Sequence, residues 1–130
     1  MQILQPADWA KPKGFSNGIA ASGRQVFVAG QIGWDAQCNF VGDDFVSQAA
    51  QALRNIVAVL AEAGAQPEHI TRMNWYVLDK QEYLGAGRAL GLAYREIIGR
   101  HYPAMTAVQV VALIEDRARL EIEVTAVVPE

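Results

Sequence analysis

The segment Asp44 to Ala63 constrains the fold more than any other part of this chain, because its apolar residues recur with the period of an α-helix. One stripe carries Phe45, Ala49, Leu53, Ile56 and Leu60, and the side expected to face away from the core carries Gln48, Gln51, Arg54 and Glu62. Asp43 is the predicted N-cap, and Gly64 suits the left-handed position that follows a helix. Such a helix needs an apolar layer to pack against.

That layer is predicted to be a β-sheet, because five segments have the residue content of strands. They are Ser16 to Ala21, Arg24 to Ile32, Ile70 to Leu78, Met105 to Leu113 and Arg119 to Val128. The first two are expected to form a hairpin across Ser22-Gly23, and a further strand at the N-terminus is left open. Trp75, in the middle of the third segment, is assigned to the core.

A second helix is predicted between the third and fourth strand segments. Asp79 and Glu82 resemble a capping box, so this helix should begin at Lys80, and Gly99 and Pro103 should end it. Its stripe consists of Tyr83, Gly87, Leu90, Tyr94 and Ile97. The glycines at 85, 87 and 91 each lower helix propensity by about 1 kcal/mol relative to alanine. We therefore expect them to allow a close approach of the helix to the sheet.

These elements give the order β-β-α-β-α-β-β, an α+β fold in one domain over residues 1–130, with two helices covering one face of the sheet. The alternation of strand side chains assigns Met105, Ala107 and Gln109 to the opposite face, together with Glu121 and Glu123. That face is then too apolar to be comfortable in water. We therefore expect a closed homo-oligomer, in which another copy covers it.

Composition excludes several partners. The formal net charge is -3 and no run of basic residues occurs, whereas nucleic-acid binding needs a concentrated positive face. The longest apolar stretch, Ala104 to Leu113, is far shorter than the roughly 20 residues of a membrane span. The segment Met1 to Pro6 shows no secretory signal, and the single cysteine, Cys38, is expected to be an inert surface thiol. A cytoplasmic location fits both observations.

Few residues could carry chemistry. His69 and His101 lie on different elements with no partner motif, so no metal site is expected, and no serine elbow or phosphate-binding glycine loop occurs. What remains is the pair Glu121 and Glu123, two residues apart on one strand face and about 7 Å from each other. Apolar neighbours would raise a carboxyl pKa and suit it to proton transfer. The alternative is that both carboxylates are solvated or paired with Arg117 or Arg119.

The chain resembles the RidA/YjgF family of small trimeric proteins from about Gly14 to Val128. The order and spacing of five short pieces carry the resemblance: Phe15-Ser16-Asn17, Ala29-Gly30-Gln31-Ile32, Asp79, Pro103-Ala104 and Leu120-Glu121-Ile122-Glu123. The resemblance implies a chorismate mutase-like fold and a homotrimer with three clefts at the subunit interfaces. It also implies hydrolysis of reactive enamine or imine metabolites to keto acids and ammonia, without a cofactor.

Carried over position by position, the resemblance implies that Glu121 positions or protonates the attacking water and that the backbone of Gly30 borders the pocket. Three positions depart from the family pattern. The arginine that clamps the substrate carboxylate is Met105, the usual tyrosine before serine is Phe15, and the usual asparagine on the second helix is Gly91. Losing the arginine removes a charge-assisted contact of about 1.5–3 kcal/mol. Ordinary amino-acid-derived imines should therefore be poor substrates.

Two functions are compatible with these matches and departures. One is a RidA-like hydrolase with a non-standard substrate, in which Glu121 activates water and backbone N–H groups near Gly30 and Ala107 orient the substrate. Trp34 would then form an aromatic wall of the pocket, unless it packs at a subunit contact. The alternative is a non-catalytic trimer that binds a small apolar or aromatic metabolite, which Met105 and Phe15 favour. Ribonuclease activity, associated with some relatives, is disfavoured because the chain has no basic stripe and no histidine pair.

Overall fold

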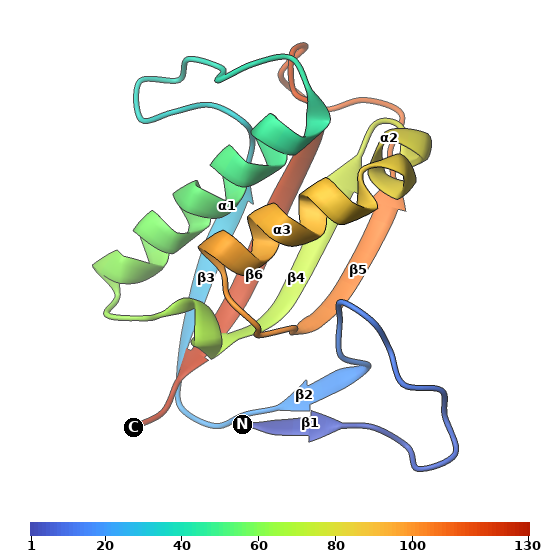
Figure 1. Cartoon of the computed structure of the whole chain (residues 1–130). Coiled ribbons are helices and arrows are strands. Elements are labelled where there is room, and N and C mark those ends of the chain that lie inside the picture. Colours follow the sequence, from blue (N-terminus) through green and yellow to red (C-terminus); the bar gives the residue numbers. More distant parts are fainter.

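The computed structural model describes all 130 residues and contains one mixed sheet of four strands with helices on one face (Figure 1). The strand order is β3 (Arg24–Gln31), β6 (Leu120–Val128), β4 (Ile70–Val77) and β5 (Ala104–Gln109). The central strand β6 runs antiparallel to β3 and β4, and β5 runs parallel to β4. Strand β5 therefore lies at an edge of the sheet, and its outer side is free apart from a single bridge between Ala104 and Ser16.

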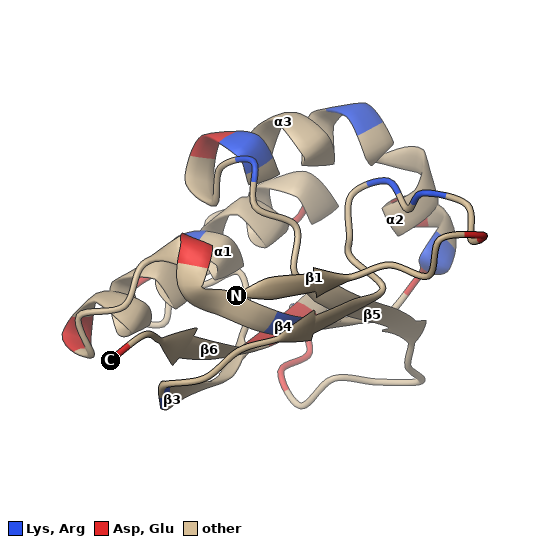
Figure 2. Ribbon diagram, turned by 90° about the horizontal axis from the view of Figure 1, so that it is seen from below, with Lys and Arg blue, Asp and Glu red and all other residues tan.

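Helix α1 (Phe45–Glu62) covers β3 and β6, as its apolar stripe predicts (Figures 1 and 2). Its N-cap is Asp44 and not Asp43, because the Asp44 carboxylate accepts a hydrogen bond from the Ser47 backbone N–H at 3.0 Å. That hydrogen bond lowers the pKa of Asp44. Asp43 instead pairs with Arg117 at 2.8 Å. Gly64 has φ +68°, which confirms the left-handed position after the helix.

Gln48 does not face away from the core, contrary to its predicted place on the polar side of α1. It is completely buried, and its amide group donates to the backbone oxygens of Gly42 and Arg117 and accepts from the Arg119 N–H. A side chain that satisfies three backbone groups offsets the cost of its burial. Gln48 thus holds the connection between β5 and β6 against the first helix.

The predicted second helix is two helices, α2 (Lys80–Gly85) and α3 (Gly87–Ile97), divided at Ala86. Asp79 caps α2 as predicted, because its carboxylate accepts from the Gln81 N–H. A short 3-10 helix, Pro67–His69, precedes β4. The expected close approach of the helix glycines to the sheet is wrong. A Cβ atom at Gly85, Gly87 or Gly91 would meet no atom within 4 Å, so open space lies beside them.

The N-terminal strand left open by the sequence is present as β1 (Gln2–Leu4), and it pairs with β2 (Gly18–Ala20). The predicted hairpin between β2 and β3 is therefore wrong. The physical reason is that the residues just before β2 are anchored next to β5, at the edge of the sheet opposite β3. Ser16 donates its backbone N–H to the Pro103 oxygen at 3.0 Å and its hydroxyl to the Tyr102 oxygen at 2.5 Å. These bonds hold the start of β2 beside β5, away from β3.

The predicted faces of strand β5 are reversed in the structure. Its register with β4 places Met105 beside Met73 and Ala107 beside Trp75, and both β4 residues are buried under the helices. Parallel neighbours in register point to the same face, so Met105 and Ala107 lie on the helix side. Val108 lies on the other face and is 44% exposed. The strand also ends at Gln109, four residues before the predicted end at Leu113.

The core lies between the sheet and the helices, and Trp75 belongs to it, as the sequence predicts. Its largest completely or almost completely buried side chains include Trp75, Leu53, Ile56, Leu60, Ile70, Met73, Leu120 and Ile122. No helix covers the other face of the sheet (Figure 2). None of the helices combines the length and the apolar character that crossing a bilayer requires.

Candidate functional site

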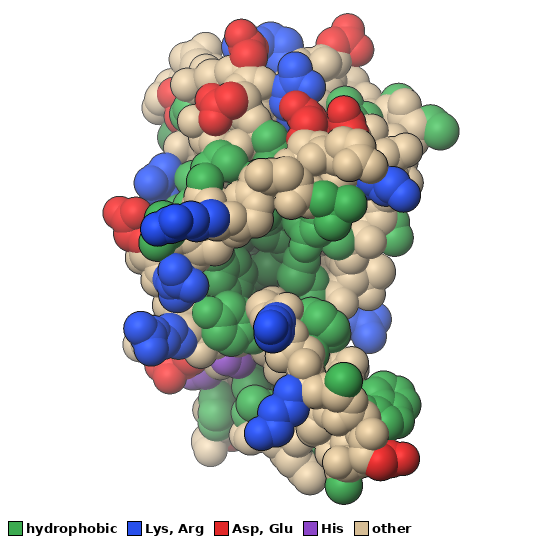
Figure 3. Space-filling model, turned by 45° about the vertical axis from the view of Figure 1, so that its right-hand side comes forward, with side chains coloured by type: hydrophobic (Ala, Val, Ile, Leu, Met, Phe, Trp, Pro, Cys, Tyr) green, Lys and Arg blue, Asp and Glu red, His purple; other side chains and the backbone are tan.

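A cavity of about 540 Å³ lies on the helix side of the sheet, next to the β5 edge. Figure 3, which turns that edge forward, shows an apolar hollow with basic side chains around it. The cavity is lined by residues from the N-terminal segment, β4, α2, α3, the connection from α3 to β5, and β5, namely Lys13, Gly14, Phe15, Trp75, Tyr83, Leu84, Gly87, Leu90, Gly91, Tyr94, Arg95, Tyr102, Met105 and Ala107. Nine of these are hydrophobic, so the cavity suits a ligand with an apolar body.

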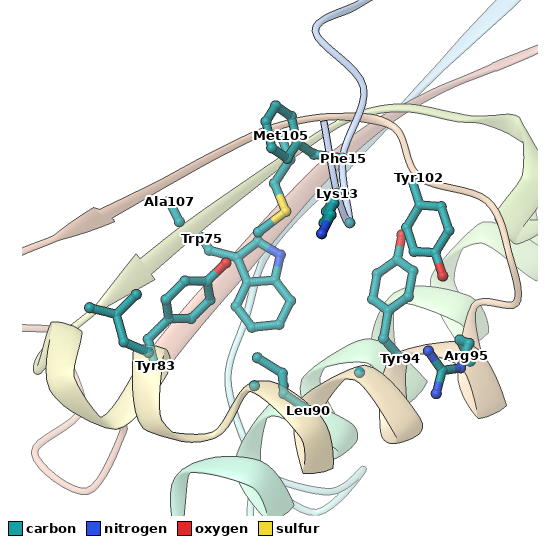
Figure 4. A pocket seen from close by; sticks show the side chains of 14 residues that line it. Lys13, Phe15, Trp75, Tyr83, Leu90, Tyr94, Arg95, Tyr102, Met105 and Ala107 are labelled. Carbon is teal, nitrogen blue, oxygen red and sulfur yellow. The ribbon is translucent and has the colours of Figure 1, made fainter. Parts of the chain in front are cut away.

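Aromatic rings form much of the wall (Figure 4). Trp75 and Tyr83 meet edge to face with centroids 5.9 Å apart, and Tyr94 stacks on Tyr102 at 5.6 Å. Gly87 and Gly91 of α3 border the same space, and their missing side chains leave it open. The glycines that weaken the helix therefore make room for a ligand.

Two tyrosines of the cavity, Tyr83 and Tyr94, keep their protons at neutral pH. Burial raises the pKa of Tyr83, and burial together with the neighbouring Tyr102 raises the pKa of Tyr94. The Tyr94 hydroxyl donates to the His101 backbone oxygen at 2.7 Å, so its proton is already used inside the protein. Tyr94 is consequently a wall residue, whereas the Tyr83 hydroxyl makes no hydrogen bond within the chain and points toward Trp75 (Figure 4).

Glu121 lies on the opposite face of the sheet, against Gly30. The space that a Cβ atom would take at Gly30 is occupied by the Glu121 carboxylate, so a larger residue at that position would displace the Glu121 side chain. Glu121 forms no ion pair and no hydrogen bond within the chain, and it is half-buried. The carboxylate is thus available to a molecule that approaches the open face.

Glu123, two residues further along β6, is already occupied. Its carboxylate accepts from the Tyr76 hydroxyl at 2.5 Å and from the Asn74 amide at 3.2 Å, both on the neighbouring strand. The hydrogen bond to Glu123, with burial and the charges of Glu123 and Glu121, raises the pKa of Tyr76. Tyr76 therefore keeps its proton and keeps Glu123 paired. Neither glutamate pairs with Arg117 or Arg119, which bind Asp43 and Glu82.

The structure divides the predicted site residues into three places. Phe15, Gly91, Met105 and Ala107 line the cavity, which brings four of them together. Gly30 and Glu121 lie together on the open face, so Glu121 does not meet Met105 within one chain. Trp34 lies elsewhere: its ring packs against Phe40 at 5.8 Å, and its backbone oxygen accepts from Asn55. Trp34 forms no wall of this cavity.

Several cavity residues were not predicted from the sequence, above all Lys13, Tyr83, Arg95 and the inward edge of Trp75. A signal for Arg95 was present, because Gly87, Gly91 and Arg95 recur at four-residue intervals and share one side of a helix. Lys13 had no such signal. It reaches the cavity only because Ser16 anchors the N-terminal segment to the strand β5 end.

Comparison with known proteins agrees with this architecture. The sequence model of the endoribonuclease L-PSP family matches residues 8–128. A RutC family protein of Synechocystis is 34% identical over 132 residues, which cover 99% of this chain and 98% of the relative. The 2-iminobutanoate/2-iminopropanoate deaminase of Salmonella typhimurium is 30% identical over 108 residues, covering 81% and 80%.

Solved structures show the same fold. A conserved Rid family protein of Yersinia pestis superposes with a TM-score of 0.83 at 29% identity, over 98% of each chain. A YjgF/YER057c/UK114 family member of Mycobacterium tuberculosis gives 0.65 at 33% identity, over 88% of this chain and 87% of that one. These superpositions place the chain in a known class of α+β proteins. The chain belongs to the endoribonuclease L-PSP family, which is the RidA/YjgF family, and its predicted α+β fold is confirmed.

Proposed function

We propose that this protein is a hydrolase of reactive enamine or imine metabolites that acts as a homotrimer, with a substrate different from that of the ordinary family deaminases. The observation that carries the proposal is the unpaired carboxylate of Glu121 against Gly30, kept within the fold of a family that includes a named imine deaminase. Met105 at the position of the carboxylate-binding arginine is the reason for a different substrate.

The chemistry needs one group that moves protons and no redox step. Water adds to the carbon of the C=NH bond, the tetrahedral intermediate expels ammonia, and a C=O bond replaces the C=N bond, so that R₂C=NH and H₂O give R₂C=O and NH₃. Glu121 accepts one proton from the attacking water and delivers it to the imine nitrogen, and it then moves the hydroxyl proton of the tetrahedral intermediate to the same nitrogen, which leaves as NH₃. An enamine first takes up a proton at carbon and becomes the imine. Backbone N–H groups near Gly30 and Ala107 orient the substrate.

Assembly joins the two halves of the site. In a closed trimer, the open sheet face of one copy lies against the β5 edge of the next, so that Glu121 of one copy borders the cavity of its neighbour. Exposed apolar residues on the open face and in the loop after β5 support such an interface. They are Phe27 (70% exposed), Val108 (44%), Val111 (104%) and Ile114 (95%). These residues replace Met105 and Ala107 as the basis for the predicted oligomer.

A second candidate function is binding without turnover. The apolar lining, with Met105 and Phe15 in place of an arginine and a tyrosine, favours a trimer that holds a small apolar or aromatic metabolite in the same cavity. Turnover and binding differ in a measurable way, because only a hydrolase releases ammonia.

RNA cleavage is not proposed, although the family description contains the word endoribonuclease. Neither histidine lines the cavity, and both are used in the backbone framework. The Nδ1 atom of His69 accepts from the Gln66 N–H at 2.9 Å, and the Nε2 atom of His101 lies 2.6 Å from the Ile70 oxygen.

The deciding experiment measures ammonia release from a panel of freshly generated imines, with ligand-induced thermal shifts recorded in parallel. The proposal predicts release above the uncatalysed rate for bulky apolar imines and little for 2-iminopropanoate. Stabilisation by ligands without ammonia release from any imine would support the binding function instead.

A further inference from the structure

Gly91 lies in the middle of helix α3, where the local fold gives no reason for a glycine. A glycine inside a helix lowers its stability, and it is usually explained by a left-handed backbone or by a close neighbour. Gly64 has such a backbone, with φ +68°, and a Cβ atom at Gly33 would collide with the Gln48 side chain. Gly91 has neither property, because its φ is outside the left-handed region and a Cβ atom there would meet nothing within 4 Å.

The same residue lines the cavity, together with Gly87 at the start of α3. A Cβ atom at Gly87 would also meet nothing within 4 Å. Residues four apart lie on one side of a helix, so the two glycines leave a stretch of α3 without side chains where it borders the cavity. Residues that break a local rule of helix stability are typical of functional positions. The space over α3 is thus open at the expense of helix stability.

The walls around this space are apolar and partly aromatic. Leu84 and Leu90 line the cavity beside the two glycines, and Leu90 points toward the Trp75 ring (Figure 4). Leu84 is 63% exposed, so an apolar group placed in this space would remove it from water. Tyr83 meets Trp75 edge to face on the same wall. An aromatic or branched apolar group suits such walls, whereas a methyl group would leave most of the 540 Å³ empty.

We infer that Gly87 and Gly91 determine the size of the substrate, because the space that they leave open takes the apolar substituent on the reacting carbon. That substituent is aromatic or branched, and a larger residue at either position restricts the protein to small imines. The reaction at this carbon rests on the proposed function, whereas the binding of an apolar group over α3 does not. Both glycines determine specificity, and neither takes part in proton transfer.

The test replaces Gly91 by leucine, a good helix former whose side chain would fill the open space. The value of kcat/KM is measured for two imines that differ only in the substituent on the reacting carbon, methyl or benzyl. We predict that the ratio of the benzyl value to the methyl value falls about tenfold or more, as expected when an apolar pocket loses room for a few carbon atoms. The melting temperature should rise by about 2–5 °C, because the helix loses a glycine.

Gly85→Leu is the matched control. It also replaces a helical glycine with open space beside it, but Gly85 is not part of the cavity lining. The benzyl-to-methyl ratio of this variant should equal that of the wild type. An unchanged ratio in both Gly91→Leu and Gly87→Leu would overturn the inference. Gly87→Leu decides the matter alone if Gly91→Leu fails to fold.

Light scattering checks the other occupant that the space could have, a side chain of a neighbouring copy. Gly91→Leu should keep the assembly state of the wild type. Loss of assembly, together with a lower melting temperature, would show that the neighbouring copy fills the space and would overturn the inference.

Binding of N-phenyl-1-naphthylamine, a neutral probe that fluoresces in apolar sites, separates this inference from the proposed function. Its affinity should fall about tenfold in Gly91→Leu and stay unchanged in Gly85→Leu. That result, with no ammonia release from any imine, would remove the hydrolase function and keep the role of the two glycines. Ammonia release by the wild type with equal kcat/KM for the benzyl and methyl imines would keep the hydrolase function and overturn the inference.

Discussion

Glu121 and Glu123 lie on the same face of one strand, yet their neighbours give them different roles. Tyr76 and Asn74 hold the Glu123 carboxylate, so it acts as a cross-strand link within the sheet. Glu121 lies against Gly30 and opposite Tyr76 on the neighbouring strand, and it accepts no hydrogen bond within the chain. An unpaired, half-buried carboxylate is free to exchange a proton with a bound molecule, whereas a carboxylate held by two donors is not. Glu121 is therefore the proton-transfer group of the proposed mechanism.

Met105 permits a gain-of-function test at the residue scale. Met105→Arg puts a guanidinium beside the cavity, where it can bind the carboxylate of a small imino acid. We predict that kcat/KM for 2-iminopropanoate rises about tenfold or more, which corresponds to a charge-assisted contact of about 1.5–3 kcal/mol. Met105→Leu is the control and should leave this value near that of the wild type. An unchanged value for Met105→Arg would show that the missing arginine does not limit the substrate range.

The sequence predicted single residues well only where a local rule applied. Gly64 and Asp79 follow from capping chemistry within a few residues of a helix end, and both predictions are confirmed. The preference for Glu121 came from the family resemblance. That Glu123 is engaged and Glu121 free depends on Tyr76 and Asn74 of another strand, which no local pattern reveals.

At the element scale, the start of helix α1 shows how neighbouring carboxylates differ. Asp44 caps the helix, whereas Asp43 forms an exposed ion pair with Arg117. We predict that Asp44→Ala lowers the free energy of unfolding by about 1 kcal/mol, and that Asp43→Ala lowers it by less than about 0.5 kcal/mol. Urea denaturation of both variants measures the difference. Equal effects, or a larger effect at Asp43, would contradict the assigned cap.

The same cap has a pH dependence whose sign follows from its lowered pKa. The unfolded chain has the ordinary value of 3.8 and the folded chain a lower one, so the capping carboxylate stabilises the fold above pH 3.8. That stabilisation is lost as the pH falls through the lower folded-state value. The difference in stability between the wild type and Asp44→Asn should therefore shrink below pH 3.8, as measured by denaturation at several pH values.

Elements with strong periodicity were predicted from the sequence, and elements whose partners lie far along the chain were not. Helix α1 matches the predicted segment to within a residue at each end. The faces of β5 were reversed because its apolar residues Val108 and Val110 were assigned to the core. The register with β4 instead turns Met105 and Ala107 to the helices. The predicted pairing of β2 with β3 was wrong for a similar reason, since Ser16 is hydrogen-bonded to Tyr102, which lies 86 residues further along the chain.

At the scale of the whole molecule, the central question is whether one copy completes the site of the next. One chain keeps the cavity and Glu121 on opposite faces of the sheet, so activity should depend on assembly. We predict a trimer by light scattering. Replacing the exposed Phe27 by aspartate should weaken the trimer, and ammonia release should fall with it. An active monomer would contradict this account.

Complementation between two inactive variants tests the shared site more sharply. Glu121→Gln removes the carboxylate, and Gly91→Trp fills the cavity from a position with open space beside it. Co-expressed copies form mixed trimers, in which about one site in four combines an intact cavity with an intact neighbouring glutamate. We predict that activity returns to about that fraction, whereas a site contained in one chain would give no recovery.

The most direct test of the central claim is the rate of ammonia release by Glu121→Gln from the best imine of the panel. We predict a fall in kcat of about 100-fold or more with unchanged thermal stability, because the variant keeps the shape of the side chain and loses its proton-accepting oxygen. Glu123→Gln is the matched control on the same strand face, and it should retain most of the rate. Full turnover by Glu121→Gln would contradict the proposed mechanism.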